Sequence, residues 1–189
     1  MKYLPRKFRE SQCDWFAKRG IPWLLTRPYQ SGPLEKQTIV HVFQSCPQDC
    51  VAVTAILRGV LVTLKEQRPE LEKVYCKQDN AGCYHCGSTI VGSTSASGVL
   101  GVKVERFDFS DPQGGKGEAD RQAATIKGHI GIYLNEGHDV NSPAQMKEAI
   151  ESYGGIPGVS VKYVKIPELS SNIPMIKWDG ISTLNNFFR

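Results

Sequence analysis

Apolar side chains recur along the chain with two different periods, and each period predicts one type of element. Between residues 51 and 64 they are spaced three and four apart, which is typical of an amphipathic helix, and Gln48 or Asp49 can cap its first turn. The β-branched run 38–43 predicts a strand. Residues 23–26 predict an earlier strand, and turn-forming residues between the two indicate an antiparallel hairpin.

The remaining segments predict further elements in the same way. Residues 86–101 are rich in Gly, Ser and Thr, and both a helix of small residues packed closely on a sheet and a loop fit them. The pattern of residues 167–189 assigns no element to this C-terminal tail. Strands are predicted at 74–77, 103–109 and 159–166, and helices at 6–19, at 143–153 and through Ala123, Ile126, Ile130 and Leu134.

The predicted strand at 103–109 alternates clearly between two kinds of position. Successive side chains of a strand point to opposite faces of the sheet. The pattern therefore predicts two faces, one with Val104, Arg106 and Asp108 and the other with Glu105, Phe107 and Phe109.

The order of these elements predicts an α/β fold. A hairpin precedes a crossover helix and a further strand, and later strands and helices follow in mixed order. The regular alternation of a doubly wound nucleotide-binding fold is missing from this order.

Composition indicates a folded protein without a membrane span. Of the 189 residues, 40% are hydrophobic and 22% are charged, and no run approaches the roughly 18 apolar residues of a membrane helix. The basic N-terminal residues lack the apolar segment of a secretory signal, so we expect the protein inside the cell. Six cysteines in a chain that can bury a good core are expected to be free thiols.

A zinc site is the alternative for four of these cysteines. Cys83 and Cys86 have the C-x-x-C spacing, and Cys46 and Cys50 could complete a set of four ligands. A second C-x-x-C pair is missing, and buried thiols explain the same residues without a metal.

Positive charge is concentrated near the N-terminus of a chain whose net charge is +4. Such an arm can neutralise the phosphates of nucleic acid, although a solvated face also explains a run of charge. The glycine-rich segment 114–117 lacks the spacing of a phosphate-binding P-loop, but a flexible basic loop near a phosphodiester fits it. The candidate nucleic-acid contacts are Lys7, Arg9, Lys18, Arg19, Lys116 and Arg121.

The stretch 74–86 is the most site-like part of the sequence. A β-prone run ends on Asp79 and Asn80, and metal-capable side chains follow at once, among them His85. An Asp just past a strand end projects into the crevice at the carboxyl edge of an α/β sheet, where ligands usually bind. The start of a turn also explains the Asp-Asn pair, because both side chains can hydrogen-bond to their own backbone.

Glu118 and Asp120 fall in the first turn of a predicted helix, and with Asp79 they make a set of three carboxylates. Mg²⁺ is held by one or two protein carboxylates and phosphate oxygens, and two such ions can promote cleavage of a phosphodiester. Acids at the start of a helix also complement its dipole, which explains Glu118 and Asp120 without a metal.

The chain resembles transposon-derived proteins of the RNase H-like superfamily, to which DDE transposases and retroviral integrases belong. The resemblance covers about residues 1–153 and is most specific in QDNAGCYH and GGKGEADR, because an Asp that ends a strand and a GKG-x-x-D helix start recur together in such proteins. The matching segments are FRESQCDWFAKRGIPW, the helix start at 46–49, KVYCKQDNAGCYH and RFDFSDPQGGKGEADRQAATIK.

This resemblance implies an RNase H-like core over residues 1–166, in which helices flank a mixed sheet, with 167–189 as a C-terminal tail. It implies that Asp79 is the second metal-binding acid and Asp120 the third, with Glu118 as the alternative to Asp120. The ion would be Mg²⁺ or Mn²⁺, the partner DNA and the location nuclear or elsewhere inside the cell, and the resemblance also allows a homo-oligomer.

The first acid of the family precedes the residues that here read MKYLP, so the resemblance implies an incomplete first strand and one missing ligand. The first hypothesis is a catalytic-core fragment related to metal-dependent cleavage or strand transfer on DNA, inactive as given. The second is a transposase relic that binds nucleic acid or protein without chemistry. A zinc-stabilised interaction module is the third.

Overall fold

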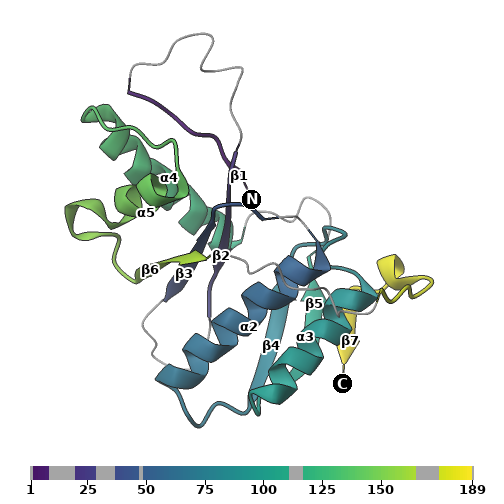
Figure 1. Cartoon of the computed structure of the whole chain (residues 1–189). Coiled ribbons are helices and arrows are strands. Elements are labelled where there is room, and N and C mark those ends of the chain that lie inside the picture. Colours follow the sequence, from purple (N-terminus) through teal and green to yellow (C-terminus); the bar gives the residue numbers. More distant parts are fainter. Residues whose placement is uncertain are drawn as a thin grey trace. The chain divides into compact units, whose positions relative to one another are not determined.

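The computed structural model describes residues 2–8, 20–28, 37–46, 49–110, 117–164 and 175–188, apart from the side chain of Ser182. The chain is a mixed α/β protein with two sheets, which confirms the predicted class (Figure 1). It divides into two compact units: unit 1 contains residues 1–46 and 116–165, and unit 2 contains residues 47–115 and 166–189. The described part of the predicted core at 1–166 thus contributes to both units, and part of the tail belongs to unit 2.

The sheet of unit 1 has the order β1-β2-β3-β6. Strands β1, β2 and β3 pair antiparallel, as the hairpin prediction requires of β2 and β3, whereas β3 and β6 pair parallel. The strands are β1 (Lys2–Tyr3), β2 (Ile21–Thr26), β3 (Thr38–Phe43) and β6 (Val159–Val164), and the helices are α4 (Glu118–Asn135) and α5 (Pro143–Glu151), with the 3-10 turn η1 (Ser152–Gly154) after α5.

The core of unit 1 lies between the sheet and its two helices. Trp23 and Val40 of the sheet pack in one buried cluster with Ile126 and Ile130 of α4 and with Met146 of α5. The two α4 residues are four positions apart, so they lie on one side of the helix, as their spacing predicts.

Unit 2 contains the second sheet, of order β4-β5-β7, and two helices. Strands β4 and β5 pair parallel, and β5 and β7 pair antiparallel. The strands are β4 (Lys73–Gln78), β5 (Lys103–Phe109) and β7 (Asn186–Phe188), and the helices are α2 (Cys50–Gln67) and α3 (Gly87–Val99), with the 3-10 turn η2 (Ile181–Thr183). Figure 1 shows α2 and α3 side by side along β4 and β5.

Helix α2 begins as predicted, because the Asp49 carboxylate accepts a hydrogen bond from the backbone N–H of Ala52 at 2.8 Å. The small-residue segment that follows β4 is the helix α3. Two of its hydroxyl groups bond within the helix: Thr94 donates to the carbonyl of Ile90 at 2.8 Å, and Ser97 donates to that of Thr94 at 2.9 Å. The buried Ser93 hydroxyl has no partner among the described residues. Side chains bonded in this way can lie at an interface without unpaired polar groups.

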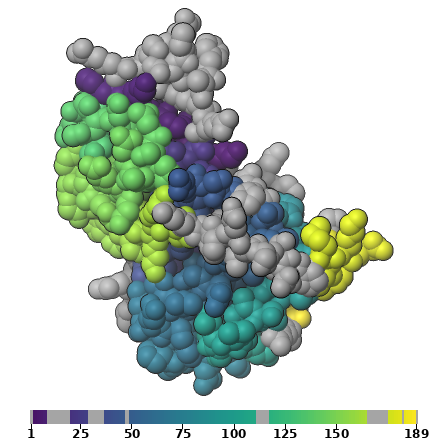
Figure 2. Space-filling model, in the orientation of Figure 1, coloured from purple at the N-terminus to yellow at the C-terminus, as the bar shows by residue number. Residues whose placement is uncertain are grey.

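The described part of the tail, residues 175–188, packs against unit 2 and contributes β7 (yellow in Figures 1 and 2). The backbone N–H of Ile176 donates to the Ser88 hydroxyl at 2.8 Å. A Cβ at Gly87 would lie 3.0 Å from the Ile176 carbonyl oxygen, so the start of α3 needs glycine for this close approach.

Strand β5 contains a bulge, and this corrects one prediction. Val104 pairs with Val74 and Arg106 pairs with Tyr75, so Glu105 is an extra residue without a partner on β4. Because the bulge shifts the alternation by one position, Val104 is buried in the same cluster as the two phenylalanines of the strand. The predicted face that combined Val104 with Arg106 was therefore wrong.

Most of the predicted helix at 6–19 lies outside the described residues. Arg6 pairs instead with Val140 in an isolated antiparallel bridge. In the part of the chain that the structure describes, no helix is long and apolar enough to cross a membrane.

Candidate functional site

Asp79 directly follows the last residue of β4, as predicted. Because β4 and β5 are parallel, Asp79 lies at the carboxyl edge of this strand pair. Its side chain is exposed, and Oδ1 accepts a hydrogen bond from the backbone N–H of Asn80 at 2.7 Å. This local bond is of the kind that the turn interpretation predicts.

The turn after Asp79 is attached to the aromatic core of unit 2 through His85. The Asn80 amide oxygen and His85 Nδ1 form a hydrogen bond. The His85 ring stacks on Phe109 with 4.1 Å between centroids and meets the edge of Phe187 at 5.7 Å. Nε2 of His85 is buried and has no hydrogen-bond partner among the described residues. Asn80 and His85 therefore fix the turn to the core.

Glu118 and Asp120 both lie in the first turn of α4, in unit 1, as predicted. The Asp120 carboxylate accepts a hydrogen bond from the backbone N–H of Gly117 at 3.2 Å. Glu118 forms an ion pair with Arg27 Nε at 3.5 Å. Asp120 thus bonds the start of its own helix, as a helix-terminal role predicts, whereas Glu118 pairs with a residue that directly follows β2.

The Mg²⁺ or Mn²⁺ site that the resemblance implies stays a prediction. Asp79 belongs to unit 2, whereas Glu118 and Asp120 belong to unit 1. Within the described ranges, no group of three or more His, Cys, Asp and Glu side chains is placed to hold a metal ion. We therefore derive no catalytic step through a metal.

The described cysteines form no disulfide, and none of them belongs to a group of three or more described side chains placed to bind zinc. Burial raises the pKa of the Cys50 and Cys83 thiols, and it raises the pKa of Cys76 to about 12. Thiols with raised pKa values stay protonated near neutral pH, so they are poor nucleophiles and poor metal ligands.

Two of the six predicted nucleic-acid contacts fall on described residues. Lys7 and Arg121 are exposed, and both belong to unit 1. The other four are Arg9, Lys18, Arg19 and Lys116, which lie outside the described residues.

The pair Ser152 and His129 was not predicted, and it has the residue types of a hydrolase. The Ser152 hydroxyl lies 3.3 Å from His129 Nε2. It also donates to the carbonyl of Ala149 at 2.7 Å, and the Ser152 carbonyl lies 3.2 Å from the same ring nitrogen. These bonds close the end of α5, so we assign the pair a structural role.

The exposed row Tyr75, Arg106 and Phe188 was also missed. Its three residues are placed side by side by the pairing of β4, β5 and β7. The alternation of β5 placed Arg106 on the same face as Asp108. Strand β7 was not predicted, so Phe188, the third residue of the row, could not be placed beside Arg106.

Comparisons with protein families, with curated proteins and with solved structures give no match to this chain.

Proposed function

We propose that this chain is a transposase- or integrase-like core fragment that binds nucleic acid and does not cleave it as given. The observation that carries the proposal is the position of two acids. Asp79 directly follows a strand of a parallel pair, and Asp120 stands in the first turn of a helix after the next strand. A strand-ending Asp and a GKG-x-x-D helix start are the two features on which the resemblance to the RNase H-like superfamily depends.

Binding without cleavage is favoured by the partners of the acids. Glu118 is neutralised by Arg27, and Asp120 accepts a bond from the start of its own helix. Carboxylates that hold catalytic ions need free oxygens that converge on a shared point. The exposed Lys7 and Arg121 support contact with phosphates.

The test is a binding and cleavage assay with double-stranded DNA at low salt. We expect the wild-type protein to bind a fluorescent duplex, to bind it more weakly as salt rises, and to leave it intact in Mg²⁺ or Mn²⁺. The variant K7A/R121A should bind several-fold more weakly, because it removes two phosphate contacts. K147A is the matched control, since Lys147 is also a cation of unit 1 and is not one of the predicted nucleic-acid contacts.

Two results would overturn the proposal. Absence of duplex binding at low salt would remove the nucleic-acid function. Metal-dependent cleavage that disappears in the variant D79N/D120N would establish an active enzyme in place of a binding core.

A further inference from the structure

The sheet of unit 2 has one covered face and one open face. Val104, Phe107 and Phe109 point to the covered face, where they pack with Ile90 of α3. The alternating residues of β4 that point the other way are all exposed. The side chains of the open face are Lys73, Tyr75 and Lys77 from β4, Lys103, Glu105, Arg106 and Asp108 from β5, and Phe188 from β7.

Two exposed aromatic rings flank an arginine in the middle of this face. Tyr75 pairs with Arg106 on β5, and Arg106 pairs with Phe188 on β7, so the three residues form one row across the strands. Tyr75 is 71% exposed and Phe188 is 73% exposed. The Arg106 guanidinium carbon lies 5.0 Å from the centre of the Phe188 ring. Neighbouring strands are about 4.8 Å apart, so the two aromatic residues stand roughly 10 Å apart along the row.

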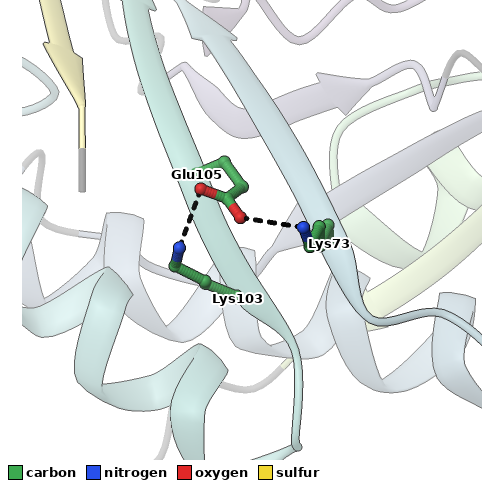
Figure 3. A network of polar contacts seen from close by, with 3 residues as sticks. All are labelled: Lys73, Lys103 and Glu105. Atoms are coloured by element: carbon green, nitrogen blue, oxygen red, sulfur yellow. Dashed lines mark hydrogen bonds and ion pairs between the residues drawn. The ribbon is translucent and has the colours of Figure 1, made fainter.

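The bulge in β5 organises the charges beside this row. Glu105 lies between Lys73 and Lys103, at 3.4 and 2.9 Å from their ammonium nitrogens (Figure 3). Both lysines lower the pKa of Glu105, and the hydrogen bond from Lys103 has the largest effect. The network holds two ammonium groups on the open face beside the row.

The open face is basic. Arg106 pairs with Asp108 at 2.5 Å, and Lys77 makes no ion pair with the described residues. Four cations stand against two carboxylates, Glu105 and Asp108, which leaves a net charge of +2. A polyanion is therefore the partner that this charge favours.

We propose that the open face of the β4-β5-β7 sheet binds single-stranded nucleic acid, whose bases stack on Tyr75 and Phe188. Aromatic rings on a sheet offer stacking surfaces to unpaired bases, and an arginine beside them adds cation–π attraction. Lys73, Lys77 and Lys103 flank the row, where the phosphates of a strand crossing the sheet would pass.

The composition of the face distinguishes this partner from a protein. The centres of protein interfaces are depleted in lysine, whereas this face has three lysines and, apart from the aromatic rings, no large apolar side chain. Binding at this face requires neither the acids Asp79 and Asp120 nor the family resemblance, so it is independent of the proposed function.

The test measures binding of a short fluorescein-labelled single-stranded oligonucleotide by fluorescence anisotropy at low salt. We expect Y75A/F188A to weaken binding roughly tenfold or more, because a stacked base contributes more than one decade of affinity at many such sites. Y75F should keep wild-type affinity, since it retains the ring. K77A should weaken binding and reduce its dependence on salt, whereas K127A, at an exposed lysine of α4, should change neither.

Three results would overturn this inference. One is an unchanged affinity in Y75A/F188A while circular dichroism shows a folded protein, and another is ultraviolet cross-linking of the oligonucleotide only to peptides without Tyr75 or Phe188. Because K7A/R121A and duplex DNA test the proposed function, failure of either idea can be recognised separately. Capture of a protein by this face without oligonucleotide binding would also contradict it.

Discussion

His41 is a buried histidine in the middle of β3, and its ring nitrogen Nδ1 has no hydrogen-bond partner among the described residues. Burial, and to a smaller extent the positive charge of Lys162, its partner on β6, together lower its pKa to about 4. A histidine in an unfolded chain titrates near its ordinary value of 6.5. Between these two values the unfolded chain binds a proton that the folded chain does not.

The stability of the protein should therefore fall as pH drops from about 6.5 to about 4, by about 3 kcal/mol from this residue alone. The variant H41L should lose less stability over the same interval, because it has no titrating ring. Urea unfolding of both proteins at the two ends of the interval measures the difference. An equal loss in wild type and H41L would contradict the assignment.

Gly87 and Gly98 provide a matched pair of tests within α3. In G87A the new Cβ would meet the Ile176 carbonyl oxygen at 3.0 Å and the Trp178 ring at 3.2 Å, so the tail should be displaced. In G98A the Cβ meets nothing within 4 Å, and the better helix propensity of alanine should add about 0.5–1 kcal/mol.

Hydrogen exchange at the Phe109 amide reports the position of the tail, because this N–H donates to the carbonyl of Asn185 at 2.9 Å. We expect faster exchange in G87A and unchanged or slower exchange in G98A. Equal exchange in both variants would show that Gly87 is not needed for the packing of the tail.

At the scale of elements, the period of apolar residues predicted those helices and strands that bury an apolar face. α2 and β3 have the positions that their apolar patterns indicate, and Asp49 caps α2 as expected. The bulge at Glu105 could not be predicted, because it depends on how β5 pairs with β4 and not on β5 alone. β7 is three residues long, which is too short for a period to be recognised, and it exists because β5 offers an edge.

The candidate site shows the same division. Asp79 was placed at a strand end, and Glu118 and Asp120 at a helix start, from local sequence alone. Asp79 and Asp120 bond backbone N–H groups close to them in sequence. The partner of Glu118 could not be predicted, because Arg27 reaches it from a distant part of the chain. The open face of unit 2 was missed for a similar reason, since its row of three residues requires three strands in register.

At the scale of the whole molecule, both units are built from two separate stretches of chain. Removal of residues 166–189 leaves every residue of unit 1 in place but takes β7, Trp178 and Phe187 from unit 2. We therefore expect this truncation to raise hydrogen exchange in α3 and β5 while α4, α5 and β3 keep their protection. Hydrogen exchange read by mass spectrometry measures both units in one sample. A uniform loss of protection in both units would contradict this expectation.

The parallel pairing of β3 with β6 has a consequence for the newly made protein. All six residues of β3 are buried in the folded protein. Its parallel partner β6 follows about 120 residues later in the chain, so at typical rates of synthesis β6 emerges roughly 6 to 24 s after β3. During this interval an apolar strand has an unpaired edge while the ribosome is still extending the chain. The sheet of unit 1 can be completed only after β6 has emerged, so this edge stays open to unwanted pairing for the whole interval.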